Sequence, residues 1–522
     1  MMLKLNVVGA MTHVVSSDRP MWRTAKSGCL PDGGGLQSPC SPPPFNIARS
    51  STISETSSRS AYDLDQCQEA STKRLHRGLI LILHRRPPSA ADRLIGRAGF
   101  REHMIMIPSD SPSVAAVCPH FNPLDPAHLS NPYPAYAEFR RETPVFYSAE
   151  YDLWFVTRYA DVVAAVRQPH IFSSVGSVQA TAELCPAAQA ILENSIGAAT
   201  MMVSSDEPVH TRIRSVLNKA FTPQRISQLE PRIREIAGGL INAFVADGHA
   251  DLVAQFALPL PGLVICDLFG IPRADLPQIK RWADDWMTLL SVAVPEEQQI
   301  VYARSMVAFQ DYLRAQLLER QHHPRQDLLT VMLPVEHGGT SALTMQEALY
   351  NAMAVTVAGY ETTTSLIANA MTILFNHPKQ YRQLCENPEL MANAVEELLR
   401  MDTSIQGLFR TTTQAVELGE VTIPANVRVF LLYGSANHDS AQFPDPERFD
   451  ITRPNARGHL TFSRGIHVCI GAALARLEIR IAVELLLQQL PNLRPAVAAQ
   501  PQRFEHFWLR GYTSLPVEWD RG

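Results

Sequence analysis

Residues 462–471 read Phe-Ser-Arg-Gly-Ile-His-Val-Cys-Ile-Gly and stand directly before a helical stretch at Gly471–Leu490. A lone cysteine is most often a small buried side chain. In this loop, however, Cys469 would sit at the positive end of a helix, where its thiolate is favoured. Gly465 and Gly471 would let the backbone approach a flat cofactor closely. The spacing of these residues therefore predicts a thiolate that binds a metal.

A second unusual stretch, Ala358-Gly-Tyr-Glu-Thr-Thr363, lies inside the long helical segment Thr344–His377. The centre of that segment is apolar on nearly every side, which is typical of a helix in the middle of a large domain. A glycine there costs about 1 kcal/mol relative to alanine, and a buried carboxylate such as Glu361 costs more unless it is satisfied. Threonine can also bond back to the carbonyl four residues earlier and open the helix. Together they indicate a groove that admits a ligand.

Three further patterns carry little weight one at a time. Glu397-Leu-Leu-Arg400 places two charges on one helix face, but such pairs are usually surface ion pairs. His210 and Arg214 are also four residues apart and could clamp a carboxylate, although a solvated basic face is the simpler interpretation. The turn Pro446-Glu-Arg-Phe449 is ordinary when it is considered alone.

The rest of the chain is mainly α with minor β (α+β). Helical spacing occurs at Pro132–Arg141, Ala160–Val166, Pro208–Ala220, Pro223–Asp247, Pro272–Leu290, Glu296–Gln321 and Met391–Met401. Strand-like stretches occur at Val145–Tyr147, Leu153–Val156, Val416–Ile423 and Val427–Leu432. No Pro/Gly/Ser linker divides residues 118–520, which indicates one large domain.

Composition excludes several classes of protein. The 522 residues are 46% apolar and 19% charged, as in soluble globular proteins, and the net charge of −5 argues against nucleic acid as a partner. The 8 cysteines are scattered without a CxxC pair, which argues against a disulfide scaffold and fits the cytoplasm. No apolar run approaches the roughly 20 residues of a membrane span.

The first 103 residues differ from the rest, with 14 Lys and Arg against 8 Asp and Glu. Gly28–Pro44 is rich in Gly, Pro and Ser, and Ser50–Ser60 is nearly a Ser/Thr run, so neither can bury enough to order itself. We expect residues 1–103 to be a disordered leader or upstream sequence joined wrongly to residues 104–522. An Arg- and Ser-rich organelle-targeting leader is a third interpretation.

Taken in order, these motifs resemble those of a cytochrome P450 of the soluble bacterial type, over about residues 118–520. The resemblance implies a helix-rich domain with small sheets around a buried haem b (iron protoporphyrin IX). Cys469 would be the axial thiolate and the only metal ligand from the chain, favouring O–O cleavage. The residues that fall where the family holds the two haem propionates are His210, Arg214, Arg410 and His467.

The same resemblance assigns two further groups. Glu361 and Thr362 fall where the family delivers protons to dioxygen, a general-acid role. Glu397, Arg400 and Arg448 fall on a buried charge triad that serves folding and haem retention.

The sequence departs from the family pattern at a few positions. Ser463 stands where glycine is usual, and we expect the turn to survive because serine is small. His438 stands where arginine is frequent, and Tyr360 occupies a variable place.

Electrons must come from another protein, because the chain has neither a GxGxxG between a strand and a helix nor a Cys-x4-Cys-x2-Cys run. We expect a ferredoxin or flavodoxin with its NAD(P)H-dependent reductase, and a monomeric P450. An acidic partner would dock on Arg212, Lys219, Arg457 and Arg464.

The expected activity is insertion of one oxygen atom from O2 into a small or medium apolar substrate. Two alternatives are a peroxide-driven P450 and a non-catalytic P450-like module that binds a partner protein; the presence of Glu361 and Thr362 argues against both. The pocket would be lined by Val175–Met202, Met287–Val294, Met353–Ala358, Ile405–Phe409 and Trp508–Gly511. Its inward residues would be Met201, Ala354, Val357, Ile405, Leu408 and Phe409.

Overall fold

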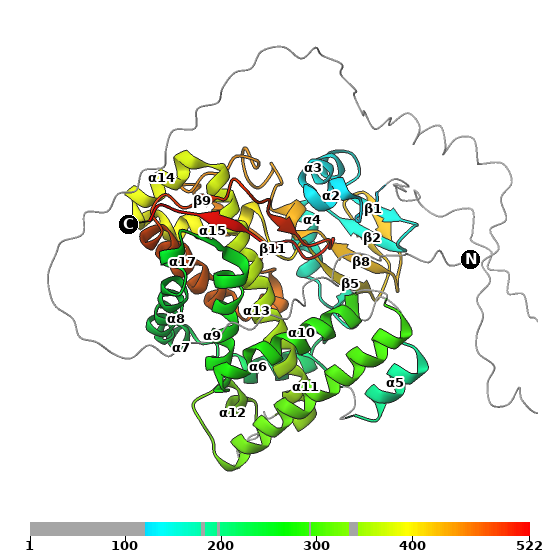
Figure 1. Ribbon diagram of the computed structural model, residues 1–522. Helices are drawn as coiled ribbons and strands as arrows, with labels where there is room; N and C mark the ends of the chain where they lie inside the picture. Colours follow the sequence, from blue (N-terminus) through cyan, green and yellow to red (C-terminus); the bar gives the residue numbers. More distant parts are fainter. Residues whose placement is uncertain (1–120, 179–182, 196–198, 292–293, 334–342, 522) are drawn as a thin grey trace, which may run out of the picture.

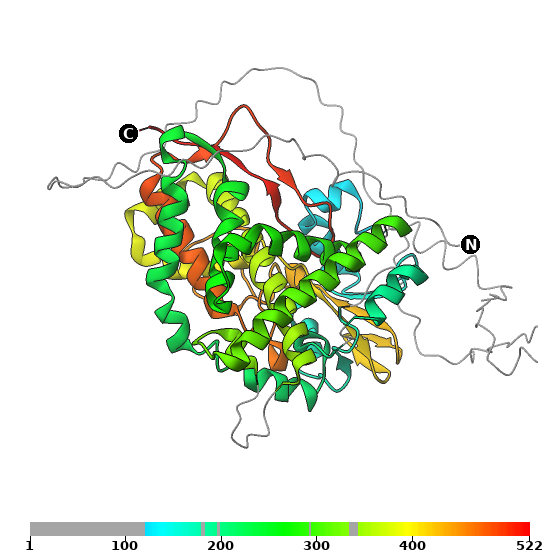
Figure 2. The same ribbon diagram turned by 60° about the horizontal axis from the view of Figure 1, so that its bottom comes forward.

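The computed structural model describes residues 121–178, 183–195, 199–291, 294–333 and 343–521. The leader expected at 1–103 therefore lies outside the described residues. Most helices gather on one side of the molecule, and a sheet made of β1, β2, β5 and β8 lies on the other (Figures 1 and 2). The expectation of a mainly helical domain with minor sheet is confirmed.

Helix α13 (Met345–Asn376) forms the centre of the helical side (Figure 1). It begins with a capping box, in which the Thr344 hydroxyl accepts from the Glu347 amide and the Glu347 carboxylate accepts from the Thr344 amide. It contacts α9 (Pro259–Phe269), α11 (Glu296–His322), α15 (Met391–Met401) and α17 (Ala472–Gln489). An apolar helix surrounded in this way is buried as predicted.

The other predicted helices are confirmed within a few residues, and one divides in two. They are α3 (Tyr133–Glu142), α4 (Tyr159–Val166), α6 (Val209–Leu217) and α10 (Leu276–Ser291), together with α11, α15 and α17. The stretch expected at 223–247 forms α7 (Pro223–Gln228) and α8 (Glu230–Asn242). Pro231 has no amide hydrogen to donate to a carbonyl of the preceding turn. It can therefore stand in the first turn of α8 but cannot continue α7.

A five-stranded sheet has the order β1-β2-β8-β5-β3. Its strands are β1 (Val145–Ser148), β2 (Leu153–Val156), β8 (Arg428–Leu431), β5 (Leu408–Thr412) and β3 (Phe172–Ser173). Only the pair β2–β8 is parallel. The expected strand at 416–423 is a hairpin of β6 (Val416–Leu418) and β7 (Val421–Ile423), which turns at Gly419 with φ +63°.

The two faces of this sheet pack against different cores. Leu408 packs with Val429 and Leu431, whereas Phe409 lies on the opposite face against Phe430, at 4.8 Å between ring centroids. Successive side chains of a strand point to opposite faces. Leu408 and Phe409 therefore lie on opposite faces of β5, so they cannot both face the pocket as expected.

Two further sheets complete the fold. A three-stranded sheet consists of β4 (His249–Asp251), β12 (Pro516–Glu518) and β9 (Arg494–Pro495), and a two-stranded sheet pairs β10 (Gln502–Arg503) with β11 (Tyr512–Ser514). Within the described ranges, none of the helices combines the length and apolarity that a bilayer crossing requires.

Candidate active site

Cys469 lies in the loop that precedes α17, three residues before the helix begins. Its amide donates to Phe462 O at 2.9 Å, which closes the loop, and its side chain is accessible. Burial raises the pKa of the thiol, while the backbone amides of Gly471 and Ala472 and the cation of Arg214 act in the opposite direction. The amides and the cation favour the thiolate, which is the form in which cysteine binds a metal.

Two residues of this loop have positive φ. Gly465 has φ +72°, and a Cβ there would lie 2.6 Å from Val166 O, so only glycine fits. Ser463 has φ +56° although it is not glycine. Its hydroxyl lies 3.0 Å from the Tyr433 hydroxyl, a hydrogen bond that offsets part of the strain. The turn survives the serine, as expected.

Four donors gather in this region, and two of them, His210 and His467, have buried ring nitrogens without an acceptor. His210 and Arg214 lie one turn apart on α6, and the His210 ring is 4.1 Å from that of His467. Both ring nitrogens of His210 and Nε2 of His467 are buried without a hydrogen-bond partner. Burial and the nearby Arg410, His210 and Arg214 lower the pKa of His467 to about 3. Such a cluster is unfavourable alone and would be satisfied by two carboxylates.

Glu361 and Thr362 lie in the middle of α13. The Thr362 hydroxyl donates to Ala358 O at 2.7 Å, as its position in the helix predicts. Ala358 is exposed although Thr356 and Val357 just before it are buried, so protein leaves the helix uncovered at this point. Burial, and then the charge of Asp284, raise the pKa of Glu361 to about 7.

Asp284, which the motifs did not reveal, connects α10 to this part of α13. Its carboxylate pairs with Lys280 one turn earlier and accepts from the Tyr360 hydroxyl at 3.3 Å. Tyr360 itself is 5% exposed, so the residue at the variable position holds the acid next to Glu361. No sequence pattern pairs residues 76 positions apart, which is why this contact was not expected.

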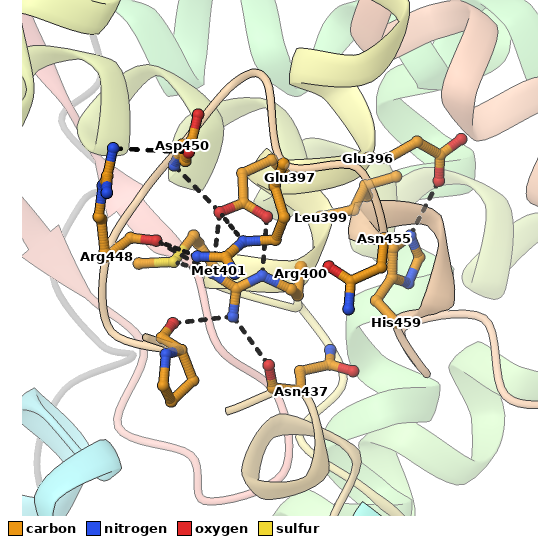
Figure 3. A network of polar contacts seen from close by, with 12 residues as sticks. Glu396, Glu397, Leu399, Arg400, Met401, Asn437, Arg448, Asp450, Asn455 and His459 are labelled. Carbon is orange, nitrogen blue, oxygen red and sulfur yellow. Dashed lines mark hydrogen bonds and ion pairs between the residues drawn. The ribbon is translucent and has the colours of Figure 1, made fainter. Parts of the chain in front are cut away.

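The buried charge triad differs from the expected one. Glu397 and Arg400 are both fully buried and joined by two hydrogen bonds of 2.7 and 2.9 Å (Figure 3). The third member is Arg453, whose Nε lies 2.9 Å from Glu397 Oε1. Arg448 was predicted in this place, but its side chain is 67% exposed and turns toward Asp450 (Figure 3). The assignment of Arg448 was therefore wrong.

The reason lies in the backbone around Arg448. Its carbonyl accepts from Arg453 Nη2 at 2.7 Å, and Arg400 donates to the carbonyls of Asn437 and Pro446 at 2.8 and 2.9 Å. The loop thus supplies acceptors to both buried guanidinium groups, and the Arg448 side chain points outward as a consequence.

His438 bridges elements in the place where arginine is frequent. Its two ring nitrogens lie 3.0 Å from Glu447 Oε2 and from Met401 O, and its ring stacks on Tyr133 at 4.2 Å. These contacts hold the ring in place, so the departure does not disturb the neighbouring triad.

The family model for cytochrome P450 matches residues 154–507. The chain belongs to the cytochrome P450 family. Among its relatives, Cytochrome P450 107B1 of Saccharopolyspora erythraea is 38% identical, over 70% of this chain and 89% of that protein. The Vitamin D(3) 25-hydroxylase of Pseudonocardia autotrophica is 37% identical, over 74% and 93%.

Solved structures agree with this assignment. Cytochrome P450 CREJ in complex with (4-ethylphenyl) dihydrogen phosphate has a TM-score of 0.73 and 33% identity, covering 77% of this chain and 99% of that one. P450BioI in complex with an acyl carrier protein that carries hexadec-9Z-enoic acid has a TM-score of 0.69 and 30% identity, covering 76% and 100%. The expected fold is thereby confirmed, as is a P450 monooxygenase activity.

The residues of this P450 fit haem b, the cofactor of the family. The unpartnered nitrogens of His210 and His467, with Arg214 and the buried Arg410, supply the donors that two propionates need. Cys469 supplies the accessible thiol.

Proposed function

We propose that this P450 inserts one oxygen atom from O2 into a small or medium apolar organic molecule. The apolar character of the expected pocket supports this: Met201 and Ala354 pack against a core that contains Met353 and Val357. The name of the relative Vitamin D(3) 25-hydroxylase also specifies an apolar substrate. The enzyme would work as a cytoplasmic monomer.

The site residues divide into three roles. Cys469 would bind the haem iron, and His210, Arg214, Arg410 and His467 would bind the propionates. When bound, the haem supplies the iron at which O2 is reduced and activated. The unpartnered nitrogens beside the thiol are the observation that carries this assignment.

Glu361 and Thr362 would supply protons for the reduction of O2. A carboxyl whose pKa is about 7 can both take and give a proton near neutral pH. The Thr362 hydroxyl, which donates to Ala358 O, can accept from a ligand or from water while it keeps its orientation. The pair favours O2-driven chemistry over the peroxide-driven and non-catalytic alternatives.

Electrons would come from a separate ferredoxin or flavodoxin and its NAD(P)H-dependent reductase. Of the four basic residues expected to dock this partner, Arg212 is held by Glu347, and Arg464 donates to Gly458 O at 2.9 Å. Arg457 is 83% exposed and Lys219 is also exposed. Arg457 also lies 3.9 Å from Glu396. An acidic partner would therefore find its most accessible cations at Arg457 and Lys219.

The test compares Cys469→Ala with the unchanged protein and with a matched control, Cys185→Ala. The control removes a buried thiol at the residue that precedes α5 (Pro186–Glu193). Under carbon monoxide and a reductant, we expect the strongly red-shifted Soret band of thiolate ligation in all but Cys469→Ala. Turnover with NADPH, ferredoxin and reductase should exceed turnover with peroxide, and Thr362→Ala should lower only the former. A Cys469→Ala protein that keeps the shifted band contradicts the assignment, and faster peroxide turnover favours the peroxygenase.

A further inference from the structure

The side chain of Asn351 fastens the segment Thr200–Met202 to α13. Its Oδ1 accepts from the Met202 amide at 2.9 Å, and its Nδ2 donates to Thr200 O at 3.2 Å and to Glu347 O at 2.8 Å. Asn351 is 1% exposed. A buried amide with three bonds to backbone groups fixes both segments relative to each other, because breaking any one of them strands a polar group.

Asn351 lies on the same stripe of α13 as Ala358 and Thr362. Positions 351, 355, 358 and 362 are spaced by four, three and four residues and so share one face of a helix. The exposed Ala358 and the Thr362 hydroxyl lie on this face. At 1.5 Å per residue, Asn351 is roughly 10 Å along the axis from Ala358.

The fastened segment belongs to an apolar wall that it forms with residues of α13. Met201 and Met202 pack against the core cluster that contains Met353 and Val357, as does Ala354 of the same helix. Farther along, a second anchor holds the segment, where Asp206 accepts from the Ser174 amide at 2.8 Å. The Ser177 hydroxyl also donates to Val203 O at 3.0 Å. Without Asn351, the wall at Met201 would therefore lose its side-chain anchor to α13, while these two contacts kept the entry to α6 in place.

We propose that Asn351 is a positioning residue that sets how large a ligand this P450 accepts over its iron. It does not touch the reacting atoms; it fixes the distance between Met201 and the stripe at Ala358 and Thr362. The inference rests on the proposed function, since the site it bounds is the haem site. Asn351 would affect the binding of ligands that carry an apolar ring next to the group that reaches the iron, and not the binding of smaller ligands without that ring.

The experiment titrates Asn351→Ala with two probes, imidazole and 4-phenylimidazole, and follows the Soret shift of nitrogen ligation. Imidazole is too small to touch the wall, so its Kd should change by less than about twofold. The Kd of 4-phenylimidazole should rise by about tenfold, because the wall that holds its ring is no longer fixed. Asn351→Asp keeps the acceptor for the Met202 amide and should recover part of the difference.

Asn455→Ala is the matched control, because the Asn455 amide also donates to a backbone carbonyl, that of Gln442 at 2.7 Å, away from this wall. It should leave the ratio of the two Kd values unchanged. Hydrogen exchange of the peptide that contains Met202 should accelerate about tenfold in Asn351→Ala and not in Asn455→Ala. A constant Kd ratio, or unchanged exchange, overturns the proposal. Failure of the proposed function appears separately, as loss of the Soret shift in the unchanged protein.

Discussion

At the scale of single residues, Ser463 shows how a side chain can tolerate a backbone conformation that suits glycine. Ser463→Gly and Ser463→Ala both remove the hydroxyl that bonds Tyr433, but only glycine relieves the strain of φ +56°. We therefore expect the glycine variant to be more stable than the alanine variant by about 1 kcal/mol. Denaturant unfolding of the haem-loaded proteins measures this. An alanine variant of equal or greater stability would show that the turn carries no strain.

The pKa of Glu361 gives a prediction about pH. Asp284 raises this pKa, and Lys280 lowers it, so Asp284→Asn should shift it below its value of about 7. Because a proton donor must be protonated, O2-driven turnover should begin to fall at a lower pH in the variant. Asp285→Asn, the same charge change on the next residue of α10, should keep the original profile. Superimposable pH profiles for Asp284→Asn and the unchanged protein would remove Asp284 from this role.

Residues in irregular loops were the hardest to assign from the sequence. Arg448 and Arg453 are five positions apart in a segment without helix or strand, so no periodicity indicates which of them points inward. The structure decides between them through backbone acceptors that the sequence does not display. By contrast, Thr362 sits in a regular helix, and its bond to Ala358 O follows from position alone.

At the scale of elements, helices were predictable and short strands were less so. α15 has the expected bounds, Met391–Met401, because its apolar residues recur with helical spacing. α9 was not predicted, although most of its residues are buried, because Pro259 and Pro261 interrupt its first turn. Those prolines cost little there, since the first amides of a helix have no partner within it. β5 was not predicted, and one of its two partners, β3, comes from a distant part of the chain.

At the scale of the whole molecule, the site joins segments that only the complete fold brings together. His210 on α6, Arg410 on β5 and His467 before α17 come from three separate regions, and no sequence spacing relates them. The family resemblance supplied their grouping, and the close approach of the His210 and His467 rings agrees with it. The contacts of Asn351 and Asp284 were not expected because their partners, Met202 and Tyr360, are far away in the sequence.

The triad of Glu397, Arg400 and Arg453 joins α15 to the loop that leads toward Cys469, so it should control the stability of the whole domain. Arg453→Ala leaves the fully buried Glu397 with one cation instead of two, and removing one partner of a buried pair costs about 3–5 kcal/mol. Arg448→Ala breaks an exposed pair of 3.6 Å and should cost under about 1 kcal/mol. Unfolding midpoints and the fraction of haem retained on purification measure both, with Arg453→Lys as the variant that keeps the charge. If Arg448→Ala lost as much stability and haem as Arg453→Ala, the assignment of Arg448 to the triad would regain support. An exposed ion pair cannot account for a loss of that size.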